Sequence, residues 1–91
     1  MNTLVLSLKQ EWFDLIKAGI KKEEYRELKP YWQKRLKFHY FDSLVFTLGY
    51  PKLEDTERRL VFKNPCISIG TGRPEWGAEF GRLYFVITWD S

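Results

Sequence analysis

The hydrophobic pattern of the first 36 residues changes its period, and this restricts the fold to short strands and helices in alternation. Residues 3–8 read TLVLSL, an apolar run that is typical of a buried strand. Ser7 and Gln10 then fit a capping box, so we expect a helix to begin near residue 8 or 9. Gly19 supplies the left-handed residue that often ends a helix. Four apolar side chains recur between these points at helical spacing: Leu8, Trp12, Leu15 and Ile16.

The segment after Gly19 alternates with the two-residue period of a strand. One face of this predicted strand would carry only charged side chains: Lys22, Glu24 and Arg26. The opposite face would carry Glu23, Tyr25 and Glu27. Pro30 suits the first position of a second helix, which is short and basic. The order so far is therefore strand, helix, charged strand, helix.

Three further strands are predicted in the rest of the chain: Ser43 to Tyr50, Arg58 to Gly70 and Arg82 to Asp90. We expect the second of these to bend or bulge at Asn64 and Pro65, because proline cannot donate to a strand ladder. Residues 70–81 contain four of the six glycines and predict an irregular loop. Five strands with two early helices predict an α+β fold with a small, strongly curved, largely antiparallel sheet that closes into a β-barrel flanked by the helices.

Length and composition limit the protein class. The 91 residues suffice for one modest core, and 44% hydrophobic residues argue against disorder, so residues 1–91 are expected to form a single domain. Cys66 is the only cysteine and therefore forms no intrachain disulfide, which favours a reducing, cytoplasmic location. We find no signal peptide pattern and no apolar run long enough for a membrane helix. The pattern around Cys66 predicts a buried structural thiol, and His39 is expected to be a packed or surface imidazole.

The net charge of +3 is concentrated in the first half of the chain. Residues 1–50 carry nine basic and six acidic side chains, whereas residues 51–91 carry six of each. A basic patch is expected where four cations follow one another without an acid: Lys29, Lys34, Arg35 and Lys37. This distribution permits a polyanionic partner, although it also serves solubility.

The residues after the first helix carry a motif. Gly19, Lys21, Glu24 and Arg26 have the spacing G-x-K-x-x-E-x-R, and they follow a strand ending in LSLK and an amphipathic helix. This arrangement resembles the ASCH domain, a member of the PUA-like superfamily. The resemblance covers the first third of the chain, and the order and total length of the later strands agree with it more loosely. It implies a small β-barrel with flanking helices and a cleft beside the first helix, near Ser7 and Lys9.

The resemblance also implies that Lys21, Glu24 and Arg26 line that cleft. A lysine and an arginine beside one carboxylate orient each other and still offer donors to a phosphate or a base edge, while Glu24 could accept from the exocyclic amine of cytosine or adenine. Alternatively, the three charges form an ion-pair network that only fixes the fold.

ASCH relatives are thought to bind RNA or other nucleic acid, and some are acetylcytidine amidohydrolases with a lysine, a threonine nucleophile and a distant glutamate. Lys21 matches the lysine, but Glu24 occupies the threonine position, where a carboxylate cannot replace an activated hydroxyl. The distant glutamate could be Glu75 or Glu79, and no acid–base pair for ribonuclease activity is apparent. The sequence therefore favours a binding module over an enzyme.

Two aromatic and basic pairs, Trp32 with Arg35 and Trp76 with Arg73, suit stacking of bases in single-stranded nucleic acid. The predicted site comprises Lys9, Lys21, Glu24, Arg26, Trp32, Arg35, Arg73 and Trp76, with no metal or cofactor. The first hypothesis is binding of RNA, or of another nucleic acid or nucleotide. The alternatives are a hydrolase of modified nucleosides that uses Lys21 and Glu24, and an adaptor whose basic patch docks an acidic protein.

Overall fold

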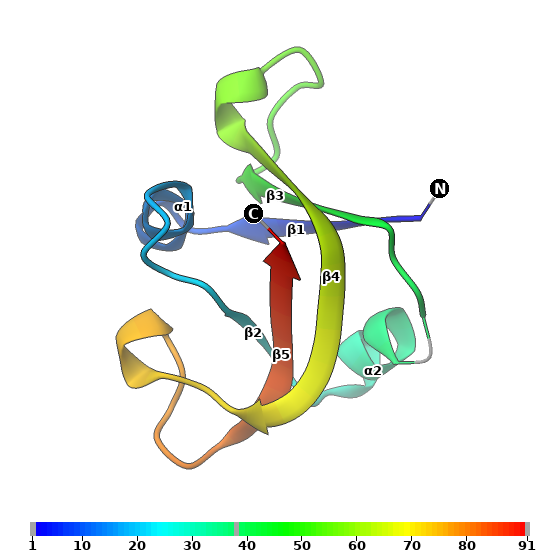
Figure 1. The fold of residues 1–91 in the computed structure, drawn as a ribbon, viewed down its shortest axis with the longest axis vertical. Coiled ribbons are helices and arrows are strands. Elements are labelled where there is room, and N and C mark those ends of the chain that lie inside the picture. Colours follow the sequence, from blue (N-terminus) through cyan, green and yellow to red (C-terminus); the bar gives the residue numbers. More distant parts are fainter. Residues whose placement is uncertain (1, 38, 91) are drawn as a thin grey trace.

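The computed structural model describes residues 2–37 and 39–90, which form one five-stranded sheet and two α-helices (Figure 1). The strands are β1 (Thr3–Leu8), β2 (Glu24–Glu27), β3 (Ser43–Leu48), β4 (Arg59–Thr71) and β5 (Leu83–Asp90). The helices are α1 (Gln10–Lys17) and α2 (Pro30–Leu36), with short 3-10 turns η1 (Thr56–Arg58) and η2 (Pro74–Trp76) in the loops. No helix in this described part of the chain is long and apolar enough to cross a membrane.

The sheet has the strand order β1-β3-β4-β5-β2, so β1 and β2 are its two edges. The pairing of β1 with β3 is parallel and the other three pairings are antiparallel. This confirms the predicted α+β class and the largely antiparallel sheet. The predicted barrel is not confirmed, because the sheet is not closed and no ladder joins β1 to β2 among the described residues. A side chain takes the place of that ladder, since the Arg26 guanidinium on β2 donates to the Ser7 carbonyl on β1 at 2.9 Å.

The long strand β4 gives the sheet its curvature (Figure 1). Its first part pairs with β3 and its second part with β5, and the register shifts between Lys63 and Cys66. Asn64 has a φ of 53°, a left-handed conformation that few residues other than glycine adopt, and Pro65 follows it. The predicted bulge at Asn64 and Pro65 is therefore confirmed. It bends β4 so that the two edge strands of the sheet approach each other.

The predicted helices are present, but the capping box is wrong. α1 ends at Lys17 and is followed by Gly19 with a φ of 76°, and α2 begins at Pro30. Ser7 lies within β1 instead of at a helix terminus, because the strand continues through Leu8, whose side chain is buried in the core. α1 begins at Gln10, and the residue before it caps the helix without a side-chain hydrogen bond.

A single hydrophobic core lies between the curved sheet and the helices. Its buried members are Leu4, Leu6, Leu8, Phe13, Ile16, Leu36, Leu44, Phe46, Phe85 and Ile87. The prediction of a buried Cys66 is wrong, because the residue after the bulge points outward and its thiol is exposed. His39 is an exposed surface residue whose Nε2 lies 3.0 Å from the Lys34 carbonyl oxygen.

The glycine-rich loop between β4 and β5 packs tightly at Gly72. A Cβ atom at Gly72 would lie 2.6 Å from the Ala78 Cβ and 2.7 Å from the Tyr25 ring, distances that real Cβ atoms essentially never show. A Cβ at Gly70 would meet only the Val86 side chain at 3.8 Å, which is an ordinary contact. Gly72 therefore allows the loop to lie directly on Tyr25 of β2.

We predict that Gly72→Ala destabilises the protein by about 1–3 kcal/mol, because overpacking forces neighbouring groups to shift. Gly70→Ala is the matched control, and its effect should be small or slightly stabilising, because alanine is less flexible than glycine when unfolded. Urea unfolding measures both free energies. Equal stability of the two variants would contradict the tight packing at Gly72.

Candidate functional site

One carboxylate organises the motif residues at the start of β2. Lys21 Nζ donates to Glu24 Oε1 at 3.0 Å, and Arg26 Nη2 donates to Glu24 Oε2 at 2.7 Å. Lys21 is only 1% exposed and Glu24 only 7% exposed. The turn after α1 supplies the lysine, and Glu24 and Arg26 lie two positions apart on the same face of β2, as the alternation predicts. The structure thus brings together all three predicted charges.

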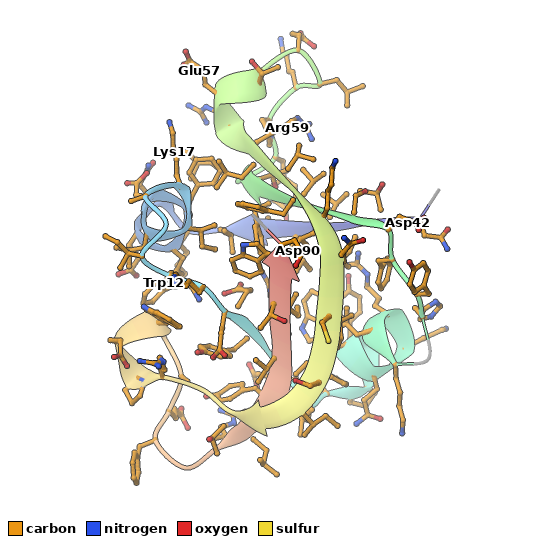
Figure 2. The ribbon with its side chains drawn as sticks, in the orientation of Figure 1. Trp12, Lys17, Asp42, Glu57, Arg59 and Asp90 are labelled. Carbon is orange, nitrogen blue, oxygen red and sulfur yellow. The ribbon has the colours of Figure 1, made fainter. Side chains whose placement is uncertain are left out.

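Lys21 lies in an aromatic and polar enclosure. Its Nζ is 5.4 Å from the centroid of the Trp12 ring and 4.9 Å from that of the Tyr25 ring, and it also donates to the Glu23 carbonyl. Burial lowers the pKa of Lys21, and the attraction to Glu24 opposes this shift. In Figure 2, Trp12 extends from α1 towards the loop that contains η2. A Cβ at Gly77 of that loop would lie 3.0 Å from the Trp12 ring, so the loop covers the indole from outside.

Arg26 connects the ion cluster to the open edge of the sheet. Its Nη2 atom serves both Glu24 and the Ser7 carbonyl of β1. The guanidinium carbon lies 5.0 Å from the centroid of the Trp32 ring on α2, within cation–π range. Its buried Nε has no hydrogen-bond partner among the described residues. Arg26 is therefore held in place through Nη2, whereas its Nε is buried and remains unsatisfied.

A cavity of about 420 Å³ opens where α1, β1, β2 and α2 meet, and its size is within the usual range for small-ligand sites. Its walls include Ser7, Lys9, Trp12, Glu24, Arg26 and Trp32. Lys9 is exposed at this cavity, whereas Lys21 does not line it and lies behind Glu24 and the aromatic rings. Among residues 2–37 and 39–90, no group of three His, Cys, Asp or Glu side chains could hold a metal ion.

Comparison with known families agrees with this geometry. A family model described as the ASCH domain matches residues 6–82, which include the end of β1, the motif, and the two helices that border the cavity, α1 and α2. The chain belongs to the ASCH domain family. It is thus a PUA-like module, a class associated with binding of nucleic acid. Neither a search of curated proteins nor a search of solved structures finds a significant match.

The two predicted aromatic and basic pairs lie in different places in this ASCH domain. Arg35 is half-buried on α2, with its guanidinium carbon 5.4 Å from the Trp32 ring, and both side chains line a second cavity next to the first. Arg73 lies 5.0 Å from the Trp76 ring in the glycine-rich loop, and neither residue lines either of these two cavities. The structure therefore brings six of the eight predicted residues to one region and leaves Arg73 and Trp76 outside it.

Tyr25 and Trp12 are parts of the candidate site that the sequence reasoning missed. The Tyr25 hydroxyl donates to Glu23 Oε1 at 2.8 Å and accepts from the Arg73 backbone N–H at 3.0 Å. Burial raises the pKa of Tyr25 to about 12. Trp12 falls on the apolar face of α1, so its pattern indicates only a core residue. The sequence offered one usable signal, and only for Tyr25. This residue lies between the motif residues Glu24 and Arg26, which places it next to the charged cluster.

We predict that Glu24→Gln destabilises the domain by about 3–5 kcal/mol, because it leaves the buried Lys21 without its counterion. The loss of Glu24 should also lower the pKa of Lys21 further, since the attraction that opposes desolvation disappears. Urea unfolding at neutral pH measures the first effect. Glu75→Gln is the control, because the pair of Glu75 with Arg73 is exposed and its atoms are 3.9 Å apart. A loss no larger than that of the control would contradict the central role of Glu24.

A second prediction concerns alkaline pH. Unfolding restores the ordinary pKa of 10.5 to Lys21, so the unfolded chain binds more protons and stability should rise as the pH approaches that value. Tyr25 has the opposite effect, because its raised pKa gives stability that is complete below pH 10.0 and lost as the pH rises towards about 12.

Urea unfolding at a series of pH values between about 8 and 12 tests these slopes. Tyr25→Phe should reduce the decline in stability above pH 10.0, whereas Tyr40→Phe, which changes an exposed tyrosine, should retain it. The same decline in both variants would show that Tyr25 is not the group responsible.

Proposed function

We propose that this ASCH domain binds single-stranded nucleic acid, with RNA as the natural ligand, in the cavity between α1, β2 and α2. The observation that carries the proposal is the pair of Arg26 and Trp32 in the cavity wall, with the guanidinium carbon 5.0 Å from the indole centroid. Basic groups beside an aromatic platform are the combination that proteins use to hold unpaired nucleotides.

Each residue of the wall has a distinct part in this proposal. The exposed Lys9 neutralises a phosphate, and Trp32 offers a surface on which a base can stack. Glu24 accepts one donor on each carboxylate oxygen from within the protein. Each oxygen has two acceptor sites, so Glu24 can also accept from the exocyclic amine of cytosine or adenine.

Lys21 acts as a positioning residue in this proposal. It is buried behind Glu24 and does not reach the cavity, so its ammonium supports the carboxylate and the two aromatic rings. A neutral side chain in its place would leave the Glu24–Arg26 pair without its inner partner. Lys21 therefore contributes to binding only through the geometry of Glu24.

A hydrolase of modified nucleosides is the second candidate, and the lowered pKa of Lys21 beside Glu24 favours it. A lysine with a lowered pKa can act as a base. Because Lys21 does not reach the cavity, it would act there through Glu24, to which it is hydrogen-bonded. Incubation with N4-acetylcytidine, followed by mass spectrometry, tests this activity. Release of cytidine that is lost in a Lys21→Ala variant would support the hydrolase, and no release would exclude this substrate.

For the binding proposal, we predict that Lys9→Gln weakens binding of a fluorescently labelled single-stranded RNA. Loss of one phosphate contact should reduce the slope of log affinity against log salt by about 0.7. Anisotropy titrations between about 50 and 200 mM salt measure this slope. Lys52→Gln is the matched control, because Lys52 is exposed and lines neither of the two cavities.

The same titrations with DNA of equal sequence test the preference for RNA. Tighter binding of DNA would overturn that preference while leaving the binding site intact. Absence of binding to either nucleic acid at low salt would reject the proposed function.

A further inference from the structure

The second cavity, of about 370 Å³, lies directly beside the first. The two cavities share three residues, Ser7, Arg26 and Trp32, so the side chains of Arg26 and Trp32 form the partition between them. The second cavity adds Arg35 and two exposed tyrosines, Tyr31 and Tyr50. The two adjoining cavities lie along the gap between the two edge strands, and we refer to them together as the groove.

The open edge of β1 forms one side of this groove. Arg26 Nη2 donates to the Ser7 carbonyl at 2.9 Å, and Arg35 Nη2 lies 3.5 Å from the Val5 carbonyl oxygen. The N–H and C=O groups of one residue point to the same side of a strand, so the amides of Val5 and Ser7 face the groove as well. Two guanidinium groups and backbone N–H donors together favour an anionic ligand. The two guanidinium groups also occupy the Val5 and Ser7 carbonyls, with which an added peptide strand would have to pair.

The aromatic residues of the second cavity are unusually accessible. Tyr50 is 95% exposed, and Tyr31 is 60% exposed with its ring edge-on to Trp32 at a centroid distance of 4.8 Å. Arg35 lies over both the Tyr31 ring and the Trp32 ring, at 5.8 and 5.4 Å. These rings could stack on a base that follows the one in the first cavity.

We propose that the two cavities hold two consecutive nucleotides of one strand, with the phosphate that joins them at Arg26. This inference rests on the proposed function and adds that the smallest full ligand is a dinucleotide. Arg26 suits the joining phosphate because it lines both cavities and Glu24 holds it in place. Arg35 and Tyr50 then recognise the second nucleotide.

Calorimetric titrations with the whole domain test this arrangement. The mononucleotide probes are AMP and CMP, and the dinucleotide probes are pApA and pCpC, because Glu24 suits a base with an exocyclic amine. We expect the better dinucleotide to bind roughly 5- to 100-fold more tightly than its mononucleotide, the gain that stacking of one base provides. Tyr50→Ala should remove most of this ratio, and Tyr50 is too exposed for its loss to unfold the domain.

Tyr40→Ala is the matched control, since Tyr40 is also exposed but lies outside both cavities, and it should leave the ratio unchanged. Equal affinities for mononucleotide and dinucleotide, or a ratio that Tyr50→Ala does not change, would overturn the two-nucleotide site. If a mononucleotide still bound in that case, the proposed function would stand. If no nucleotide and no RNA bound, both would fall together.

Discussion

The rest of the site depends on the two ion pairs of the Glu24 carboxylate. One of its oxygens accepts from the buried Lys21 and the other from Arg26, so a single acidic group forms ion pairs with a cation on each side. Without it, Lys21 would be a buried charge without a counterion, and Arg26 would lose the contact that aims it at the Ser7 carbonyl. The turn after α1, the start of β2 and the open edge of β1 are therefore joined through one side chain.

The same cluster explains why the site lies where the sheet remains open. A ladder between β1 and β2 would satisfy their edge groups with backbone partners and would leave no space for a ligand. Instead, Arg26 and Arg35 reach across from β2 and α2 to carbonyl groups of β1. Side-chain donors bridge the gap without filling it, and both cavities lie along it. The incomplete closure of the sheet is thus what creates the groove.

Local chemistry made much of this fold predictable. Gly19 marked the end of α1, Pro30 the start of α2 and the Asn64–Pro65 pair the bulge, because each of these residues imposes its own backbone conformation. The motif spacing also brought the charged residues to one place. The capping pattern at Ser7 failed because burial of Leu8 extends β1, and burial is a tertiary effect. The open gap between β1 and β2, where a closed barrel was predicted, was equally beyond reach, since the contact that spans this gap joins residues 19 positions apart.

The energetics of the cluster argue that it serves more than stability. Buried ion pairs are often no more stabilising than well-packed apolar residues of similar volume, because desolvation offsets their attraction. Here burial lowers the pKa of Lys21, the inner cation of the cluster. The buried Arg26 Nε also has no partner among the described residues, so the cluster retains the cost of an unsatisfied donor. The aromatic rings of Trp12 and Tyr25 and the close-packed loop at Gly72 hold the cluster in this arrangement from outside. An arrangement that retains this cost and ends at a cavity wall agrees with the proposed presentation of Arg26 and Glu24 to a ligand.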